Sequence, residues 1–535
     1  MEKLWNVKID GRNMDSGEII DSILENRGID DIDAFLRPNE DNILPLEDLR
    51  NIEKAAQIIL DGVEDNKTFY VHYDVDVDGC TAGSIAARYL EYLGANVYVG
   101  INHGKKHGIE ELDPYCIGGA DIVWIVDSIQ TSIEPYEELL NMGVQIIITD
   151  HHLIEQELCE EMEKRGIILV SSAVDYPNPD LSGSATTWKL CKMMDYLNLD
   201  DYADNLIDLA ATGLVADMCS MISMENRAIC NKAFGNLRNP GIKKINGSYA
   251  FVARNISFGV APKINAANRT DNNELAMNIF LSDDEDEISE IVKGLNDCRT
   301  EQNKIVDKIM PSLQEQAESQ LDNKVMFFFI PDDTEASVSG LIGNKLLEQF
   351  QRPLFILKKW ENEYAGSMRA VGVRSFKEYC DNIGIGTCAG HENAAGFNVP
   401  IDQFEDFKVE ILDALKDVEF VSETSADIQL STRQVTGDLI KSLNAINRIS
   451  GTGFEPITVM IESNNYEVSS MSGGKHLKII DESGMIFVKW NYNGDWDFNG
   501  KFCAIGTLER AHYGRYDYLQ LTIQDWKCID KSENL

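Results

Sequence analysis

Short apolar runs alternate with helical stretches between residues 67 and 283. The apolar runs are residues 69–71, 97–99, 122–126, 144–148 and 167–170, and helical spacing marks residues 135–142, 187–196 and 206–214. This alternation predicts a mostly parallel sheet with helices on both faces. We therefore expect an α/β domain over residues 67–283.

The rest of the chain is expected to form four further parts. These are an N-terminal cap at 1–66, a connector helix at 284–322, a second α/β domain at 323–422 and a small β-barrel at 423–535. Apolar positions recur every three or four residues from 288 to 313, which indicates either a long connecting helix or a surface helix of one domain. A glycine-rich turn is expected at 384–391. Short strands between Asn, Gly and Asp turns predict the barrel.

Composition narrows the class of protein. The net charge is −41, from 48 basic and 89 acidic residues, and this argues against a protein that coats DNA or an anionic membrane non-specifically. The 11 cysteines are scattered singly, so we expect reduced thiols and a cytoplasmic location. No apolar run approaches the roughly 18 residues of a membrane span, and we predict a monomer without a membrane segment.

One stretch concentrates titratable groups at two-residue spacing. His72, Asp74, Asp76 and Asp78 alternate with apolar residues, and Gly79 follows. If the stretch is one strand, all four polar side chains share a face. Their ionised carboxylates would repel one another, which favours a bound cation, although a solvated acidic strand edge is the simpler alternative. Gly79 would then turn the chain into a helix over residues 81–92.

Further ligand candidates follow other predicted elements. They are Asp127, Asp150, His151, His152 and Asp217. Carboxyl ends of parallel strands meet at one edge of a sheet, where ligands bind, so these side chains are expected to join the first group. Asp217 alone has a second interpretation as a helix cap. Carboxylate and imidazole donors suit Mn²⁺ or Mg²⁺, and the set is large enough for two ions, which can activate a hydroxide between them and neutralise a phosphate.

The order and spacing of these motifs resemble the DHH phosphoesterase superfamily. Residues 389–397 are similar to the glycine-rich signature of the DHH-associated domain, and residues 262–269 resemble a segment of RecJ-type single-strand DNA exonucleases. The C-terminal barrel, with residues 453–456 and 476–478, is similar to the OB-fold of that family. Departures from the family pattern stand at Tyr73, Ala389 and Asn268. A further departure lies at residues 100–106, where Lys105 or Lys106 would replace an arginine.

The resemblance implies a role for each candidate residue. One ion would be bound by His72, Asp76 and Asp127, and the other by Asp78, Asp127, His151 and Asp217. Asp74 and Asp150 would orient ligands, and His152 and His391 would contact the scissile phosphate. The remaining substrate-binding residues would be Asn265, Arg269, Ser367, Arg369 and Gly390. A surface ion pair is the alternative for either arginine.

The resemblance also implies an activity, namely metal-dependent 5′→3′ hydrolysis of single-stranded DNA to nucleoside 5′-monophosphates. Two alternatives stay open: a DHH phosphodiesterase of short oligoribonucleotides or cyclic dinucleotides, and a non-catalytic replication scaffold. A host or replication protein is the further partner that would bring so acidic a chain to DNA. Aromatic residues of the barrel are expected either to stack on bases or to fill the core. They are Trp490, Tyr492, Trp496, Phe498, Tyr513, Tyr516 and Tyr518.

Overall fold

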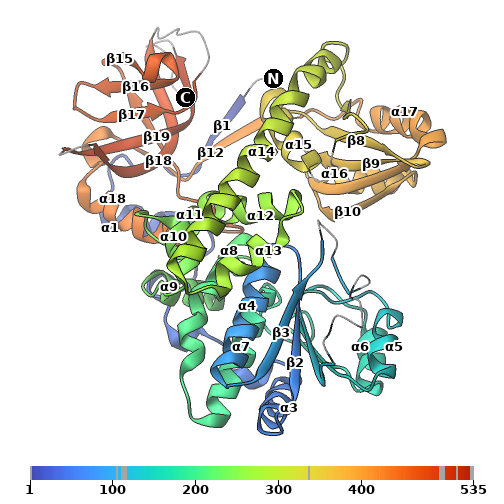
Figure 1. Cartoon of the computed structure of the whole chain (residues 1–535). Coiled ribbons are helices and arrows are strands. Elements are labelled where there is room, and N and C mark those ends of the chain that lie inside the picture. Colours follow the sequence, from blue (N-terminus) through green and yellow to red (C-terminus); the bar gives the residue numbers. More distant parts are fainter. Residues whose placement is uncertain are drawn as a thin grey trace. The chain divides into compact units, whose positions relative to one another are not determined.

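The computed structural model describes residues 3–103, 107–109, 112, 117, 119–334, 338–420, 422–492, 500–513 and 516–529 (Figure 1). Its contacts divide the chain into two compact units. Unit 1 comprises residues 1–27, 300–443 and 457–535, and unit 2 comprises residues 28–299 and 444–456. The predicted cap at 1–66 is thus shared between the units, and the predicted domain limits stay predictions. Lys105, Lys106, Trp496, Phe498 and the side chains of Tyr513 and Tyr516 lie outside the described residues.

Unit 2 contains the predicted parallel sheet. Its strands are β2 (Thr68–Tyr73), β3 (Asn96–Ile101), β4 (Ile122–Val126), β5 (Gln145–Asp150) and β6 (Ile168–Ser171). They lie in the order β3-β2-β4-β5-β6, and every pairing is parallel. The chain therefore moves outward from β2 to β3 and then returns to β4 on the other side. A reversal of this kind opens a crevice beyond the carboxyl ends of the two central strands.

Helices cover both faces of this sheet, as predicted (Figure 1). On one face α4 (Val77–Tyr92) packs against α7 (Gly183–Asn198) and α8 (Ile207–Ala216), and α3 (Ile52–Glu64) packs against α7. On the other face α5 (Glu134–Asn141) and α6 (Gln156–Lys164) share a buried apolar cluster with β4 and β5. Burial of both faces explains why β4 is apolar at every position.

The second half of unit 2 is helical. It contains α9 (Met224–Phe234), α10 (Pro240–Asn246), α11 (Ala253–Asn255), the π-helical η4 (Ile256–Val260), α12 (Ala261–Arg269) and α13 (Asn273–Leu281). The predicted long helix is confirmed as α14 (Glu285–Glu318), which contains Pro311 and continues from unit 2 into unit 1. No helix of the described residues is both long enough and apolar enough to cross a membrane.

The middle of unit 1 is a five-stranded sheet in the order β10-β11-β9-β8-β7. Its strands are β7 (Met326–Phe329), β8 (Leu354–Trp360), β9 (Glu363–Arg369), β10 (Thr387–His391) and β11 (Ala394–Pro400). α14 and α15 (Ser339–Phe350) pack on one face, and α16 (Phe376–Ile383) and α17 (Phe404–Ala414) pack on the other. The prediction of a turn throughout 384–391 is wrong for its second half, because residues 387–391 pair with β11.

The C-terminal part of unit 1 is a seven-stranded sheet in the order β13-β14-β18-β19-β17-β16-β15. Its strands are β13 (Ile428–Leu430), β14 (Val459–Ser463), β15 (Tyr466–Met471), β16 (His476–Asp481), β17 (Ile486–Lys489), β18 (Lys501–Tyr513) and β19 (Tyr516–Ile529). The sheet is consistent with an OB-like fold, but among the described residues no pairing joins β13 to β15, so the barrel is not closed. Trp490 is 48% exposed and lies against His476, so stacking on a base stays open for it.

The N-terminal residues of unit 1 are anchored to this C-terminal part. β1 (Lys3–Val7) pairs in parallel with β12 (Ser422–Ala426), and Arg27 after α1 (Ser16–Asn26) forms a two-fold ion pair with the buried Asp427. Residues 3–27 and residues 422–427, far apart in sequence, are therefore held together by strand pairing and by an ion pair. The hydrophobic pattern does not reveal this contact.

Candidate metal and phosphate sites

The aspartate-rich stretch leaves the sheet earlier than its alternation predicts. β2 ends at Tyr73, and α4 begins at Val77. Asp76 is the N-cap of α4, and its carboxylate accepts a hydrogen bond from the backbone N–H of Gly79 at 2.9 Å. The prediction of one strand through Asp78 is therefore wrong. An aspartate is a poor strand residue and a good helix cap, so the local preference overrides the two-residue pattern.

Gly79 lies in the first turn of α4, directly against the preceding turn. A Cβ on Gly79 would lie 2.5 Å from the Cβ of Asp74 and 2.7 Å from its carbonyl oxygen. Neighbouring atoms do not approach so closely, so only glycine lets the helix begin here. The close packing keeps Asp74 and Asp76 beside the end of β2.

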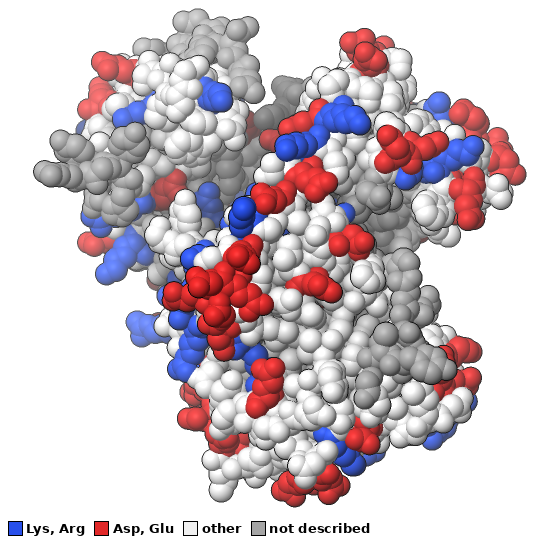
Figure 2. All heavy atoms as spheres, in the orientation of Figure 1, with Lys and Arg blue, Asp and Glu red and all other residues white. Residues whose placement is uncertain are grey.

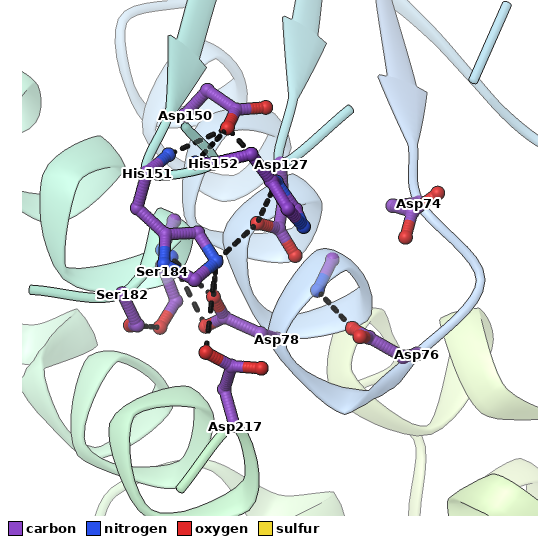
Figure 3. Close-up of polar contacts among 12 residues, drawn as sticks. Asp74, Asp76, Asp78, Asp127, Asp150, His151, His152, Ser182, Ser184 and Asp217 are labelled. Carbon is purple, nitrogen blue, oxygen red and sulfur yellow. Dashed lines mark hydrogen bonds and ion pairs between the residues drawn. The ribbon is translucent and has the colours of Figure 1, made fainter. Parts of the chain in front are cut away.

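Four side chains from separate elements meet at the carboxyl edge of the sheet (Figure 3). Asp127 follows β4, His151 follows β5, Asp78 comes from the first turn of α4, and Asp217 is the C-cap of α8. The Nε2 atom of the histidine lies 3.2 Å from Asp127, 3.6 Å from Asp217 and 3.8 Å from Asp78. The structure thus brings together the four residues that the sequence assigned to one ion, although Asp217 caps a helix at its carboxyl rather than its amino end.

The start of α7 holds the Asp78 carboxylate, which the sequence did not predict. The backbone N–H groups of Gly183 and Ser184 donate to its two oxygens at 2.7 and 3.1 Å. A helix N-terminus stabilises a carboxylate in this position. A Cβ on Gly183 would lie 2.4 Å from Asp127, and one on Gly213 would lie 2.1 Å from Asp78. These two glycines leave the room that the carboxylates occupy.

Burial and mutual repulsion raise the pKa of several of these acids. Burial is the main cause for Asp127, whose pKa lies well above its usual value, and the charges of Asp78 and Asp76 add to it. Burial and Asp78 raise the pKa of Asp217 to about 7. Burial, followed by a neighbouring carboxylate, also raises the pKa of Asp76. A nearby cation stabilises the ionised form of a carboxyl whose pKa is raised by burial and repulsion.

Asp150 has different surroundings from these acids, and it fixes the loop after β5 through hydrogen bonds. It is fully buried, and its carboxylate accepts hydrogen bonds from the backbone N–H groups of Ile129, His151 and His152 at 2.6–2.7 Å. The same carboxylate lies 2.9 Å from the ring Nδ1 of His152. That hydrogen bond raises the pKa of His152 to about 9, so the imidazole is positively charged at neutral pH.

A second set of contacts surrounds Asp74 and His72. His107 Nδ1 lies 2.6 Å from one oxygen of Asp74, and the Ser128 hydroxyl donates to the other at 3.3 Å. Sequence reasoning missed His107, whose only signal is that it is one of eight histidines. His72 is buried, and its Nε2 lies 3.1 Å from the carbonyl oxygen of Gly108.

The donor atoms of this site fit divalent cations. Among the described residues, three overlapping groups have ligand atoms close enough to share an ion: Asp127–His151–His152, Asp78–His151–Asp217 and Asp74–Asp76–Asp127. The Oδ1 atom of Asp127 is buried and accepts no hydrogen bond from a described residue, which leaves it available as a ligand. Oxygen and imidazole donors suit Mn²⁺ or Mg²⁺. His72 lies outside these groups, so its role as a ligand stays a prediction.

The segment that follows Asp217 is fixed by residues from much later in the chain. The backbone N–H of Met221 donates to the carbonyl of Thr452 at 2.8 Å. The buried guanidinium of Arg227 donates to the carbonyls of Met221 and Ile449, and it stacks 3.6 Å above the ring of Phe35. Residues 444–456 belong to unit 2 for this reason. Their contacts hold the chain immediately after a candidate ligand.

On the other side of the site, α12 carries the predicted substrate-binding residues Asn265 and Arg269. Both side chains are half-buried. Between them in sequence, the buried Asn268 donates through Nδ2 to the carbonyl of Val75, within the turn that separates Asp74 from Asp76. α12 therefore contacts the candidate metal site directly.

Three other predicted residues lie on one face of the five-stranded sheet in unit 1. Ser367 and Arg369 are two residues apart on β9, so their side chains share a face. In the register of β9, β11 and β10, Ala394 lies opposite both Arg369 and His391. Arg369 and the exposed His391 therefore lie on the same face, with the small alanine between them. Gly390 precedes His391 with a φ of 127°, which favours glycine.

The N-terminus of α15 completes this polar face. The hydroxyl of the buried Ser339 lies 2.8 Å from that of Ser367, and Arg369 donates to Asn344 at 2.9 Å. A Cβ on Gly340 would lie 2.7 Å from the guanidinium, so glycine makes room for it. Burial lowers the pKa of Arg369, and none of the described carboxylates pairs with it. A guanidinium, hydroxyls and a helix N-terminus together form a suitable anion site.

Comparison with known proteins finds a family model that matches the part of the chain with this geometry. Residues 68–214 match the model of the DHH family, N-terminal domain. That span includes β2 to β6 and most of the acidic site. Residues 68–214 are thus similar to a DHH domain, and a longer part of the chain is similar to RecJ proteins.

The chain is 26% identical over 488 residues to the Bacillus subtilis protein named "Putative SPbeta prophage-derived single-strand DNA-specific exonuclease YorK", and the match covers 84% of each chain. It is 26% identical over 392 residues to the single-stranded-DNA-specific exonuclease RecJ of Thermus thermophilus, which covers 69% of this chain and 54% of that protein. The crystal structure of RecJ in complex with Mn²⁺ from the same organism aligns with a TM-score of 0.80 and 22% identity, over 98% of this chain and 80% of that one. The fold of this chain is therefore that of RecJ.

Proposed function

We propose that the protein is a metal-dependent exonuclease that degrades single-stranded DNA from its 5′ end to nucleoside 5′-monophosphates. The observation that carries the proposal is the group of Asp78, Asp127, His151 and Asp217 at one sheet edge, with ligand atoms within reach of a shared cation. The similarity to proteins named as single-strand DNA-specific exonucleases supports the choice of substrate.

The proposed ligand sets follow the geometry. One ion would be held by Asp78, Asp127, His151 and Asp217. The other would be held by Asp76 and Asp127, with Asp74 or His72 completing its set. Two such cations, Mn²⁺ or Mg²⁺, would neutralise the scissile phosphate and lower the pKa of an attacking water. The protein itself supplies the fixed positions, because α7 holds Asp78 and the loop after β5 holds His151.

His152 and the buried Asp150 are proposed to act on the scissile phosphate as a pair. A hydrogen bond with Asp150 keeps the His152 imidazole charged at neutral pH, and a cation at this position attracts a phosphate oxygen. His391, in unit 1, is proposed to bind a phosphate of the strand. Ser367, Arg369 and Arg269, with Asn265, are proposed to bind the 5′-phosphate of the strand, a task that suits guanidinium groups.

The bond that breaks in this proposal joins phosphorus to the 3′-oxygen of the first nucleotide. Water adds to phosphorus, and the first nucleotide leaves with its own 5′-phosphate and a new 3′-hydroxyl. The shortened strand retains a 5′-phosphate and can enter the same site again. A site that recognises 5′-phosphate therefore recognises both the first substrate and each successive product strand.

The two alternative functions differ in substrate or in metal dependence. A phosphodiesterase of short oligoribonucleotides or cyclic dinucleotides would hydrolyse a dinucleotide faster than a long 5′-phosphorylated DNA strand, and direct comparison of the two rates tests the choice. A non-catalytic scaffold would show neither hydrolysis nor a rise in melting temperature with Mn²⁺. The candidate metal site contains all the carboxylates that the proposed ligand sets require, which favours an enzyme over a scaffold.

A further inference from the structure

One continuous stretch of this acidic chain contains no aspartate or glutamate. Residues 226–270, here called the acid-free segment, hold eight of the 48 lysines and arginines and none of the 89 acids. Acids occur at about every sixth position of the whole chain, so the segment departs strongly from its surroundings. It lies entirely within unit 2 and forms most of α9 together with α10, α11, η4 and α12. The segment itself therefore contributes only positive charge to the surface of unit 2.

Three lysines of the acid-free segment make no ion pair with any residue that the structure describes. Lys243 and Lys244 are exposed near the end of α10, and Lys263 lies half-buried in α12. Burial and the nearby charge of Arg299, on α14, lower the pKa of Lys263. Figure 2 shows blue Lys and Arg spheres along the left edge of unit 2, where Figure 1 labels α9, α10 and α11, next to a group of red Asp and Glu spheres. Lysines that pair with no carboxylate are available to bind an anion such as a phosphate.

Two large rings of the segment are exposed, and in sequence they lie between Lys244 and Lys263. Tyr249 follows α10 and is 75% exposed, and Phe258 on η4 is 74% exposed. A π-helical turn such as η4 often marks a functional position. Exposed rings interleaved with lysines form the kind of surface on which bases of a single strand stack.

The segment leads to the candidate metal site. α10 packs against η4, which packs on α8 and continues into α12. α8 ends at Asp217, and α12 contacts the turn of Asp74 and Asp76 through Asn268. The segment is therefore joined by direct packing to α8 and α12, two elements that border the candidate metal site.

We propose that the acid-free segment binds single-stranded DNA beyond the nucleotide that is being cleaved. Lys243, Lys244 and Lys263 contact backbone phosphates, and Tyr249 and Phe258 stack on bases. This inference rests on the proposed exonuclease function and assigns a path to its substrate. It also gives a chain of charge −41 a segment that can hold a polyanion, since the contacting segment itself contains no acids.

The test for the lysines compares two full-length triple variants with the same change in net charge. One is Lys243→Ala/Lys244→Ala/Lys263→Ala, and the control is Lys54→Ala/Lys67→Ala/Lys164→Ala, elsewhere in unit 2. Binding to a 5′-phosphorylated oligothymidylate of about 20 nucleotides is measured in EDTA over a range of salt concentrations. Each lost phosphate contact lowers the slope of log K against log salt by about 0.7 for single strands, so the first variant should lose about 2 from its slope, and the control should match wild type.

Equal slopes and equal affinities for the two triple variants would overturn the inference. Its failure is distinguishable from failure of the proposed function, because binding is measured without hydrolysis. If wild-type protein binds through these lysines and yet degrades no strand in Mn²⁺, the exonuclease proposal fails and the binding surface stands.

The aromatic residues are tested separately. Phe258→Ala and Tyr249→Ala should each weaken binding of the same oligonucleotide about fivefold or more, as loss of one stacked base does. Tyr196→Ala is the matched control, since Tyr196 on α7 is 71% exposed and lies outside the acid-free segment. Wild-type affinity in both Phe258→Ala and Tyr249→Ala would remove the stacking part of the inference.

Discussion

The two sheets that carry the candidate residues have opposite chemistry. In unit 2, the edge of a parallel sheet gathers buried and half-buried carboxylates from the ends of β2, β4 and α8, together with Asp78. In unit 1, the face of a mostly antiparallel sheet presents Arg369, Ser367 and the exposed His391. The first site therefore contains mainly acidic groups, and the second contains basic and hydroxyl groups.

This difference follows from how each sheet displays side chains. Parallel strands end together, so residues that follow them converge although they are distant in sequence. Antiparallel strands instead place alternate residues of neighbouring strands in register on one face. The edge therefore suits a compact cluster around cations, and the face suits an extended phosphate-bearing ligand. Substitutions should separate these two roles.

The largest effect is expected from Asp127→Asn. Loss of the carboxylate shared by two candidate metal groups should lower nuclease activity by about 10²–10³-fold or more. The rise in melting temperature on addition of Mn²⁺ should also disappear, while the metal-free variant should be at least as stable as wild type because repulsion is relieved. Asp121→Asn, at the opposite edge of the same sheet, is the control. Full activity of Asp127→Asn would remove the metal assignment.

A smaller loss is expected from Asp150→Asn. Asp150 contacts His152 and three backbone N–H groups, so its replacement should displace the loop after β5 and reduce activity or Mn²⁺ affinity about 10–100-fold. Mn²⁺ titration followed by activity measures both quantities. Unchanged Mn²⁺ affinity together with unchanged activity would show that the loop does not depend on this carboxylate.

Arg369→Lys should alter the preference for the strand end and leave the metal site intact. A lysine cannot reproduce the planar donors of arginine, so the ratio of kcat/KM for 5′-phosphoryl over 5′-hydroxyl strands should fall about tenfold. Arg352→Lys is the matched control, because among the described residues Arg352 of the same unit donates only to the carbonyls of Leu321, Asn323 and Phe350. An unchanged ratio in Arg369→Lys would place recognition of the 5′ end elsewhere.

Asp427→Asn should affect neither site and act on stability alone. It breaks the buried pair with Arg27, which costs roughly 3 kcal/mol of unfolding free energy. Burial by itself would raise the pKa of Asp427, but Arg27 outweighs it and lowers that pKa. The stabilisation is therefore present at neutral pH and is lost as pH falls below about 4. Chemical denaturation at several pH values should show a weaker acid dependence in the variant, and identical curves would contradict this assignment.

Sequence periodicity predicts the parallel sheet of unit 2 well, because both faces are buried and the strands are continuous apolar runs. It fails at residues 74–78, where helix capping by Asp76 ends the strand pattern early. The residues that meet at the sheet edge are also predicted well, since motifs at strand ends converge by topology. Their division between two ions is not determined by spacing, and the roles of His72 and Asp74 stay predictions.

Other parts of the sites depend on packing that leaves little trace in a single sequence. Gly183 and Gly213 matter only because carboxylates from α4 and β4 approach them. Ser339 becomes relevant only when α15 lies against β9. Residues 444–456 join unit 2 through contacts with Met221 and Arg227 that no local pattern indicates. A serine-flanked glycine before a helical run, as at 182–184, is the only signal that could have marked any of these positions.

The proposed function is tested most directly by the polarity of digestion. Single-stranded DNA with a labelled 5′-phosphate is incubated with the full-length protein and Mn²⁺, and a matched strand carries its label at the 3′ end. The proposed function predicts that the 5′ label is released as a mononucleotide from the first turnover, that the 3′ label is released last, and that EDTA stops both. Release of the 3′ label first, or equal release in EDTA, would contradict it.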